Sequence, residues 1–386
     1  MKGSDRRSAF GIISGHGRRS NRDPISTSDR ILTTRPRTGP AIDPARTFTS
    51  LAATVRESGL LRRAQWFYVA AGAALLLAFG GVVTGFVLLG DSWFQLLMAG
   101  ALGLILTQVA FIAHEASHRQ VLSSGPANDR VGRILAVLVV GMSYQWWMTK
   151  HTRHHANPNR IGKDPDIDPD VVAFHPESAA AQRGLLAAIT RRQAWLFYPL
   201  LLLEGVNLHV HSIRSLVSRR AVDGRWLELG MLAARTALYL GVVFWVLPLG
   251  MAFAFLGVQL AVFGFYMGTS FAVNHMGMPV IPAEARLDFF AKQVRTSRNI
   301  KGGFWASLLL GGLNYQVEHH LFPNMARPHL ARARDLVREH CRTHDIPYTE
   351  MSLGRAHVAV VEHMRRVGLA ARDPFTCHLV AQFRRA

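Results

Sequence analysis

The chain has 386 residues, 49% of them hydrophobic, and its 44 lysines and arginines against 25 aspartates and glutamates give a formal net charge of +19. This length allows one large domain or two ordinary ones. A basic balance can indicate nucleic-acid binding, but the uneven distribution of the charges leads us to expect no nucleic-acid partner. Asp91 is the one charged residue between Ala64 and Ala113, and Arg235 is the one between Leu229 and Ala283. Two apolar segments of this length exclude an ordinary soluble protein.

Residues 1–50 are rich in Arg, Ser, Thr, Gly and Pro, and we expect a disordered basic tail there. Residues 51–350 are expected to form the main domain, and 351–386 a C-terminal cytoplasmic extension. Within the main domain, each apolar segment can cross a bilayer twice, because one crossing needs about 20 residues. The segments break at the turn-forming stretches LGDSW and LPLGM. We therefore predict membrane-spanning helices near 66–89, 93–113, 230–248 and 251–273.

The expected fold is an all-α integral membrane protein with four transmembrane helices in two hairpins. The rest of the chain must then lie on one side of the membrane, and it holds nearly all the Lys and Arg. Cytoplasmic loops carry such an excess, so both termini and a helical cap are predicted to be cytoplasmic. The excess also favours contact with anionic membrane lipids. Cys341 and Cys377 would then stay reduced, and no disulfide is expected.

Seven of the eighteen histidines fall into three tight clusters in the predicted cap. Spacings of three and four place side chains on one face of a helix, so each cluster can direct two or three imidazoles toward one point. The clusters are His114 and His118; His151, His154 and His155; and His319 and His320, the last pair preceded by Gln316.

Imidazoles held so close would repel one another if protonated and are costly to bury without partners. A metal ion removes both problems, because neutral imidazole is a preferred ligand. Seven histidines exceed the three protein ligands of a catalytic zinc, so two metals are indicated. An all-nitrogen ligand set suits iron, although ligand type leaves zinc, manganese and copper open.

The first cluster also matches H-E-x-x-H, in which Glu115 would be the general base of a zinc peptidase. An intramembrane zinc peptidase would need an aspartate inside the membrane, whereas the D-G pair Asp223-Gly224 lies in a basic cytoplasmic segment. A peptidase would also leave the other two clusters unused. We keep it as a remote alternative.

The pattern H-x-x-x-H, H-x-x-H-H and Q-x-x-H-H on four spanning helices resembles the membrane fatty-acid desaturases, a family defined by three histidine boxes. The similarity runs from about residue 60 to 350 and includes HHANPNRIGKDPDID and GLNYQVEHHLFPNMARPHL. The Gln form of the third box is typical of the front-end and linoleoyl-type branch, which includes sphingolipid long-chain-base desaturases.

The resemblance implies a non-haem centre of two iron ions that uses O2 to place a double bond in a long fatty-acyl chain carried as acyl-CoA or acyl-lipid. A membrane hydroxylase or ketolase with the same metal site, or a sphingolipid-base desaturase, stays open as an alternative. The family's additional metal-binding histidine matches His275, and Gln316 would be a ligand or lie close to one. Four neighbours could support the ligands, although the two glutamates could equally be exposed charges and the aspartate part of a surface turn: Glu115, Asp164, Asn274 and Glu318.

The resemblance also bears on partners and source. No H-P-G-G motif of a fused cytochrome domain occurs in the sequence. We therefore expect an electron donor in trans, of ferredoxin or cytochrome type. The missing motif and the composition favour a bacterial plasma-membrane enzyme.

Overall fold

We describe the fold from a computed structural model, which describes residues 44–219 and 221–371. The described residues are mostly helical, as predicted, and they include one short pair of parallel strands, β1 (Asn299–Lys301) and β2 (Glu350–Ser352). Ile300 pairs with Met351 in their register.

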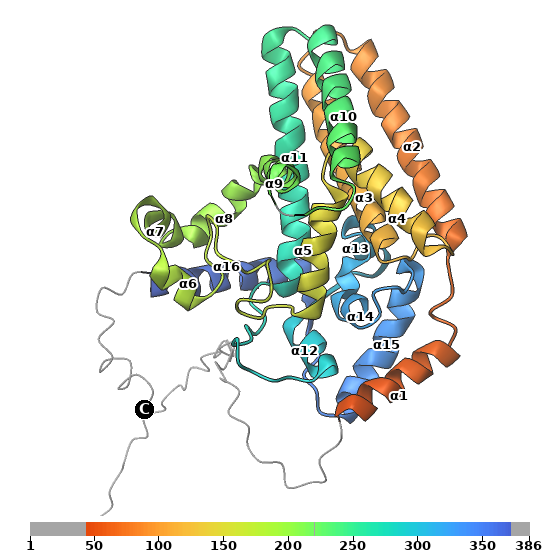
Figure 1. Ribbon diagram of the computed structural model, residues 1–386, viewed down its shortest axis with the longest axis vertical. Helices are drawn as coiled ribbons and strands as arrows, with labels where there is room; N and C mark the ends of the chain where they lie inside the picture. The colour runs from red at the N-terminus through yellow and green to blue at the C-terminus, as the bar shows by residue number, and fades with distance from the viewer. Residues whose placement is uncertain (1–43, 220, 372–386) are drawn as a thin grey trace, which may run out of the picture. The chain divides into compact units, whose positions relative to one another are not determined.

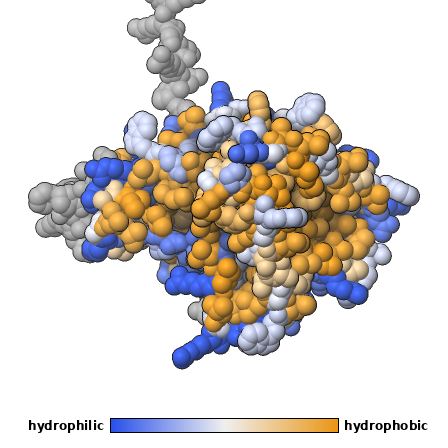
Figure 2. Space-filling view, turned by 90° about the horizontal axis from the view of Figure 1, so that it is seen from above, coloured by the Kyte–Doolittle hydropathy of each residue, from blue (hydrophilic) through white to orange (hydrophobic). Residues whose placement is uncertain are grey.

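Among the described residues, four single helices are long and apolar enough to cross a membrane, and they correspond to the four predicted ones. They are α2 (Gln65–Leu88), α3 (Gln95–Ser117), α10 (Arg225–Val246) and α11 (Leu249–His275), and Figure 1 shows them running side by side. The helix α10 starts five residues before the predicted range, because Glu228 is buried against the neighbouring segment and accepts hydrogen bonds from Ser143 (2.6 Å) and Arg133 (3.1 Å). Viewed from above, the ends of these helices present a mostly hydrophobic face with hydrophilic residues at its rim (Figure 2).

The buried side-chain amide of Gln95 holds the connection between α2 and α3 together. Gln95 donates hydrogen bonds from Nε2 to the carbonyl oxygens of Phe86 (2.7 Å) and Gly90 (2.9 Å). The first bond satisfies a carbonyl in the last turn of α2, where helix carbonyls lack partners within the helix, and the second ties Gln95 to the turn after α2.

The segment 131–148 is bent. It comprises the end of α4 (Gly125–Ile134), the π-helix η1 (Leu135–Val140) and the start of α5 (Tyr144–Ala156), and the chain bends by 116° between η1 and α5. Gly141 permits the bend with a φ of 92°, and Ser143 then caps α5 by accepting a hydrogen bond from the Trp146 N–H (3.1 Å).

The remaining elements lie at one end of the long helices and beside them (Figure 1). They are α1 (Pro44–Glu57), α6 (Pro176–Ala181), α7 (Gly184–Thr190), α8 (Gln193–Leu201), α9 (Glu204–Val217), α12 (Phe289–Thr296), α13 (Gly303–Leu309), η2 (Leu313–Tyr315), α14 (Gln316–Leu321), α15 (Arg327–Thr343) and α16 (Leu353–Ala370).

Two helices overlap the expected tail and the expected C-terminal extension, α1 at the start and α16 at the end of the described residues. Residues 1–43 of the predicted tail lie outside the described residues, but 44–50 belong to α1, because Phe48 packs against the rings of Phe289 and Phe322. The expected extension from 351 is part of the helical body as far as Ala371, since α16 buries Val360 and Met364 against α8. Short amphipathic helices of this kind are hard to separate from tails by composition alone.

Helices α9 and α11 approach so closely that their backbones touch. A Cβ atom built on Gly264 would collide with the backbone nitrogen of Gly205 and the carbonyl oxygen of Leu201. A Cβ atom on Gly257, in the same helix, would meet nothing within 4 Å.

We predict that Gly264→Ala lowers the thermal unfolding midpoint of the detergent-solubilised protein, because overpacking of this kind costs about 1–3 kcal/mol. The matched control Gly257→Ala should leave the midpoint unchanged or raise it, since Ala favours a helix over Gly. Equal midpoints for the two variants would contradict the close packing of α9 on α11.

Candidate metal centre

All eight predicted ligand histidines and Gln316 come together where four helices end. The C-terminal end of a helix carries a partial negative charge, so four such ends favour a cation between them. His114 and His118 end α3, His151, His154 and His155 lie in the last turns of α5, His275 ends α11, and Gln316, His319 and His320 lie in α14.

Five of these side chains form the first histidine group: His114, His118, His151, His155 and His319. One ligand nitrogen from each lies within 4.8 Å of all the others. The Nε2 atom of His151 is 3.1 Å from Nε2 of His114 and 2.8 Å from Nε2 of His118. Nitrogens this close can share one cation.

The second histidine group consists of His154, His275 and His320, whose ligand nitrogens also lie within 4.8 Å of one another. The Nε2 atoms of His154 and His275 are 3.3 Å apart. The groups adjoin each other, since the ring of His155 stacks on that of His320 at 4.3 Å between centroids. The structure thus places two candidate metal sites side by side.

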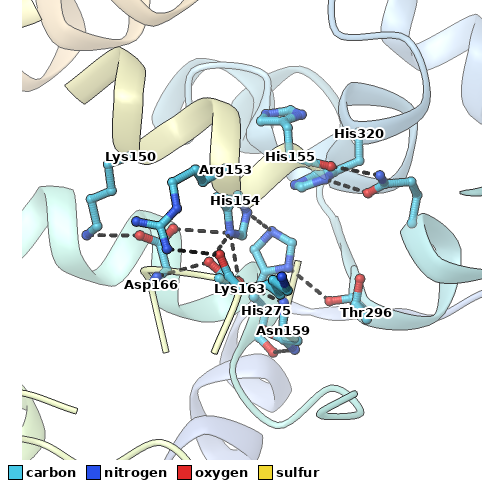
Figure 3. Close-up of polar contacts among 12 residues, drawn as sticks. Lys150, Arg153, His154, His155, Asn159, Lys163, Asp166, His275, Thr296 and His320 are labelled. Carbon is cyan, nitrogen blue, oxygen red and sulfur yellow. Dashed lines mark hydrogen bonds and ion pairs between the residues drawn. The ribbon is translucent and has the colours of Figure 1, made fainter. Parts of the chain in front are cut away.

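In the second group, neighbouring acceptors determine which ring nitrogens carry hydrogen. The Nδ1 atoms of His154, His275 and His320 donate to the Asp164 carboxylate (3.0 Å), the Thr296 carbonyl (2.9 Å) and Gln293 Oε1 (2.9 Å), respectively (Figure 3). Each Nδ1 therefore carries its hydrogen, and each Nε2 can offer a lone pair toward the other two. The Nε2 atom of His320 is buried without a hydrogen-bond partner among the described residues. Three lone pairs directed at one buried point fit a metal ion.

Burial keeps most of these imidazoles neutral, which is the form that binds metals. It lowers the pKa of His118 to about 3, and burial together with neighbouring histidines lowers the pKa values of His155 and His320. His154 differs. Burial acts to lower its pKa, but the carboxylates of Asp166 and Asp164 outweigh burial and raise it. These carboxylates favour a positive charge on His154, whether a proton or a bound metal supplies it.

Gln316 presents its amide nitrogen to the second group. Its Nε2 lies 2.9 Å from Nε2 of His275, and its Oε1 accepts a hydrogen bond from Asn274 Nδ2 (3.2 Å). Asn274 also donates to the carbonyl of Ser270 (3.1 Å). An amide binds metals through oxygen, so in this arrangement Asn274 turns the oxygen of Gln316 away from His275.

Glu115 of the H-E-x-x-H match is buried in an ion pair. Arg327 donates from Nε (2.7 Å) and from a terminal nitrogen (2.6 Å) to its two carboxylate oxygens. The pair joins α3 to α15 and occupies the carboxylate that a zinc peptidase would use as its base.

Glu318 of the third box is buried too, and burial raises its pKa to about 7. Its carboxylate accepts hydrogen bonds from Asn299 Nδ2 (2.7 Å) and from the hydroxyl of Tyr348 (2.8 Å). The hydrogen bonds of Glu318 therefore connect α14 to β1 and to the segment before β2.

The sequence did not identify three residues that position this centre: Gln293, Thr296 and Asp166. The first two lie on α12 and reach the histidines only through the tertiary fold. Asp166 lies 3.2 Å from His154 Nδ1 and forms a 2.9 Å ion pair with Lys150 (Figure 3). The one sequence signal for Asp166 was its position in the acidic run that follows the second histidine cluster.

A cavity of about 1120 Å³ opens beside both histidine groups. Apolar residues of α8, α9 and α11, among them Leu201, Val206 and Phe271, line much of it, together with Trp146 and Trp147 of α5. Typical small-molecule pockets measure about 300–1,000 Å³, so this space suits a long apolar ligand.

A fold with four helices of membrane-spanning length and a buried cluster of eight histidines defines a membrane protein with a site of metal-binding character. Residues 91–352 match the family described as fatty acid desaturase. The chain therefore belongs to this family and is an oxidoreductase.

Named relatives agree with the assignment. The chain is 28% identical to a Delta(8)-fatty-acid desaturase of Helianthus annuus over 86% of its own length and 75% of the relative's. It is 28% identical to an acyl-lipid (9-3)-desaturase of Borago officinalis (72% and 65% covered). It is 27% identical to the Delta(6)-fatty-acid desaturase fat-3 of Caenorhabditis elegans (78% and 70% covered). These relatives are eukaryotic, so they lend no support to the expected bacterial source.

We predict that Arg327→Met strongly lowers the thermal unfolding midpoint, because it leaves Glu115 as an uncompensated buried charge, at a cost of about 3–5 kcal/mol. The double variant Glu115→Leu with Arg327→Met should recover part of the loss. Arg342→Met, which breaks an exposed pair with Glu339 on the same helix, is the control and should change the midpoint little. An unchanged midpoint for Arg327→Met would contradict this role.

Proposed function

We propose that this protein is an O2-dependent fatty-acyl desaturase of the linoleoyl and front-end type, with one iron ion bound by each histidine group. The observation that carries the proposal is the second group, where three fixed Nδ1–H donors leave three Nε2 lone pairs directed at one buried point. The first group offers five more nitrogens beside it.

The bound irons would supply O2 activation, in which O2, two electrons from a donor, two protons and two hydrogens from adjacent carbons become two waters. The protein's own residues orient and enclose the reactants. Asp164 and Gln293 hold the imidazoles of His154 and His320 in the ligating orientation. The apolar walls of the large cavity hold the acyl chain beside the histidines and exclude water from it.

We infer that the four long helices form two hairpins in the membrane and that the histidines lie in a cytoplasmic cap. Exposed tryptophans support this placement, because they favour membrane interfaces. Trp66 and Trp226 stand at the starts of α2 and α10, and Trp93 and Trp245 stand near the opposite ends of the hairpins. The excess of Lys and Arg outside these helices favours the cytoplasmic side for the histidines.

A separate electron donor of ferredoxin or cytochrome type would deliver electrons from the cytoplasm. The net positive charge of the chain favours an acidic donor, because charge complementarity raises the rate of association.

The charges around the cavity favour an acyl-lipid over acyl-CoA as the substrate. Four carboxylates line the cavity, whereas Lys150 and Arg153 are the two Lys or Arg side chains in its lining. Lys150 and Asp166 are paired with each other, which leaves three carboxylates against Arg153. Coenzyme A carries several phosphate charges, and the carboxylates would repel them. The same carboxylates would attract the trimethylammonium group of phosphatidylcholine. The aromatic face of Trp146 would also attract this cation. The four carboxylates are Asp166, Asp168, Asp170 and Glu204.

The first test combines metal analysis with product analysis of the purified protein. We expect about two iron ions per chain and O2-dependent double bonds in the acyl product. His154→Ala and His319→Ala should each abolish unsaturation while the protein stays in the membrane, and His344→Ala should keep the activity. A hydroxylated product would support the hydroxylase alternative. Zinc at one equivalent with chelator-sensitive proteolysis would support the peptidase and contradict our proposal.

The second test compares carriers in nanodiscs. We predict conversion of a long acyl chain esterified to phosphatidylcholine and at least tenfold slower conversion of the same chain as acyl-CoA. Glu204→Gln should raise the KM for the lipid, and Glu177→Gln, at an exposed position outside the cavity lining, should not. Faster conversion of acyl-CoA would show that the cavity charges do not select the carrier.

A further inference from the structure

A second, much smaller cavity of about 30 Å³ lies on another side of His114. It shares His114, Trp147 and Phe271 with the large cavity, so the two spaces adjoin at the first histidine group. Its walls come from α3, η1, α5 and α11: Ala110, Phe111, Ala113, His114, Ala136, Val140, Met142, Tyr144, Trp147, Met267 and Phe271.

The lining of the small cavity gives water little to bind. Eight of its eleven side chains contain neither nitrogen nor oxygen. The hydroxyl of Tyr144 is already engaged with Asp129 at 3.3 Å. The other two polar side chains are His114, whose Nδ1 is buried without a hydrogen-bond partner among the described residues, and Trp147, whose indole carries one N–H. A buried water needs two to four polar partners, and apolar cavities of sufficient size stay dry and take apolar molecules.

The backbone around the small cavity is unusual. The wall contributed by η1 is a π-helix, where the N–H groups of Gly141 (2.9 Å) and Met142 (2.8 Å) both bond to the carbonyl of Ala136. Short π-helical turns often occur at functional sites. The wider turn meets small side chains from α3, Ala110 and Ala113, and so leaves a void where protein interiors are normally close-packed.

The size of the void limits what it can hold. One water occupies about 10–15 Å³ on this scale, so 30 Å³ accepts a molecule of two or three heavy atoms but no length of acyl chain. Dioxygen has two heavy atoms, is apolar and dissolves better in hydrocarbon than in water.

We propose that the small cavity is a binding pocket for molecular oxygen, which it holds beside His114 before reaction. This proposal rests on the proposed function, because it gives the co-substrate of that reaction a place separate from the acyl chain. The pocket would let O2 and the acyl chain reach the first histidine group from different sides, so that neither displaces the other.

Xenon tests the pocket without requiring metal or turnover. In xenon-pressurised crystals of the native protein we expect a xenon atom between Ala113, Ala136 and Phe271. In Ala136→Leu, whose side chain fills this space, the xenon should be lost. Ordered water in the native pocket, or no xenon there, would overturn the proposal.

Kinetics then test the role of the pocket. Ala136→Leu and the smaller change Ala136→Val should raise the KM for O2 at least threefold, with iron content, the KM for the acyl substrate and the double-bond position unchanged. The control Ala73→Leu, at an exposed position on α2, should match the native enzyme. If the KM for the acyl substrate or the double-bond position changes and the KM for O2 does not, the pocket serves the acyl chain and the proposal is wrong. Failure of the desaturase proposal would appear separately, as missing iron or missing unsaturation in the native protein.

Discussion

The mutual repulsion of eight buried imidazoles is the constraint on which the rest of the structure depends. Without a shared cation, side chains this close would have to stay neutral and leave lone pairs facing one another. Four helix ends lower the cost by directing their negative ends inward. The acceptors at Asp164, Thr296 and Gln293 then select one orientation for three of the rings. The long helices α3 and α11 bring His114 and His275 to the same depth as the clusters of α5 and α14.

The glutamates within the histidine boxes hold neighbouring elements of the fold together. Glu115 and Glu318 stand next to candidate ligands in the sequence, yet their hydrogen bonds join α3 to α15 and α14 to β1. A side chain one position before or after a ligand in a helix points about 100° away from it, and in these two cases it points toward the packed side. The glutamate therefore anchors the helix while its neighbour faces the site. The role of the glutamate in H-E-x-x-H therefore depends on its partner, which here is Arg327.

Much of this architecture follows from local patterns. The four spans were predictable because uncharged segments of this length have one stable environment, and the histidine clusters because spacings of three and four share a helical face. The partners of the clusters were not predictable, because Gln293 and Arg327 contact the boxes across long distances in the sequence. The bend at Gly141 depends on φ at one glycine, which hydropathy does not record. The helices α1 and α16 were not expected from the sequence, because they are stabilised by packing that composition does not reveal.

One contact at the centre has an optical consequence. The indole ring of Trp147 stacks on the imidazole of His151, with 4.3 Å between centroids and 19° between planes. An open-shell ion held by His151 would lie within collisional range of the excited indole and quench its emission, whereas a closed-shell ion such as zinc would not. The fluorescence of Trp147 should therefore report whether the ion in the first histidine group is open-shell or closed-shell.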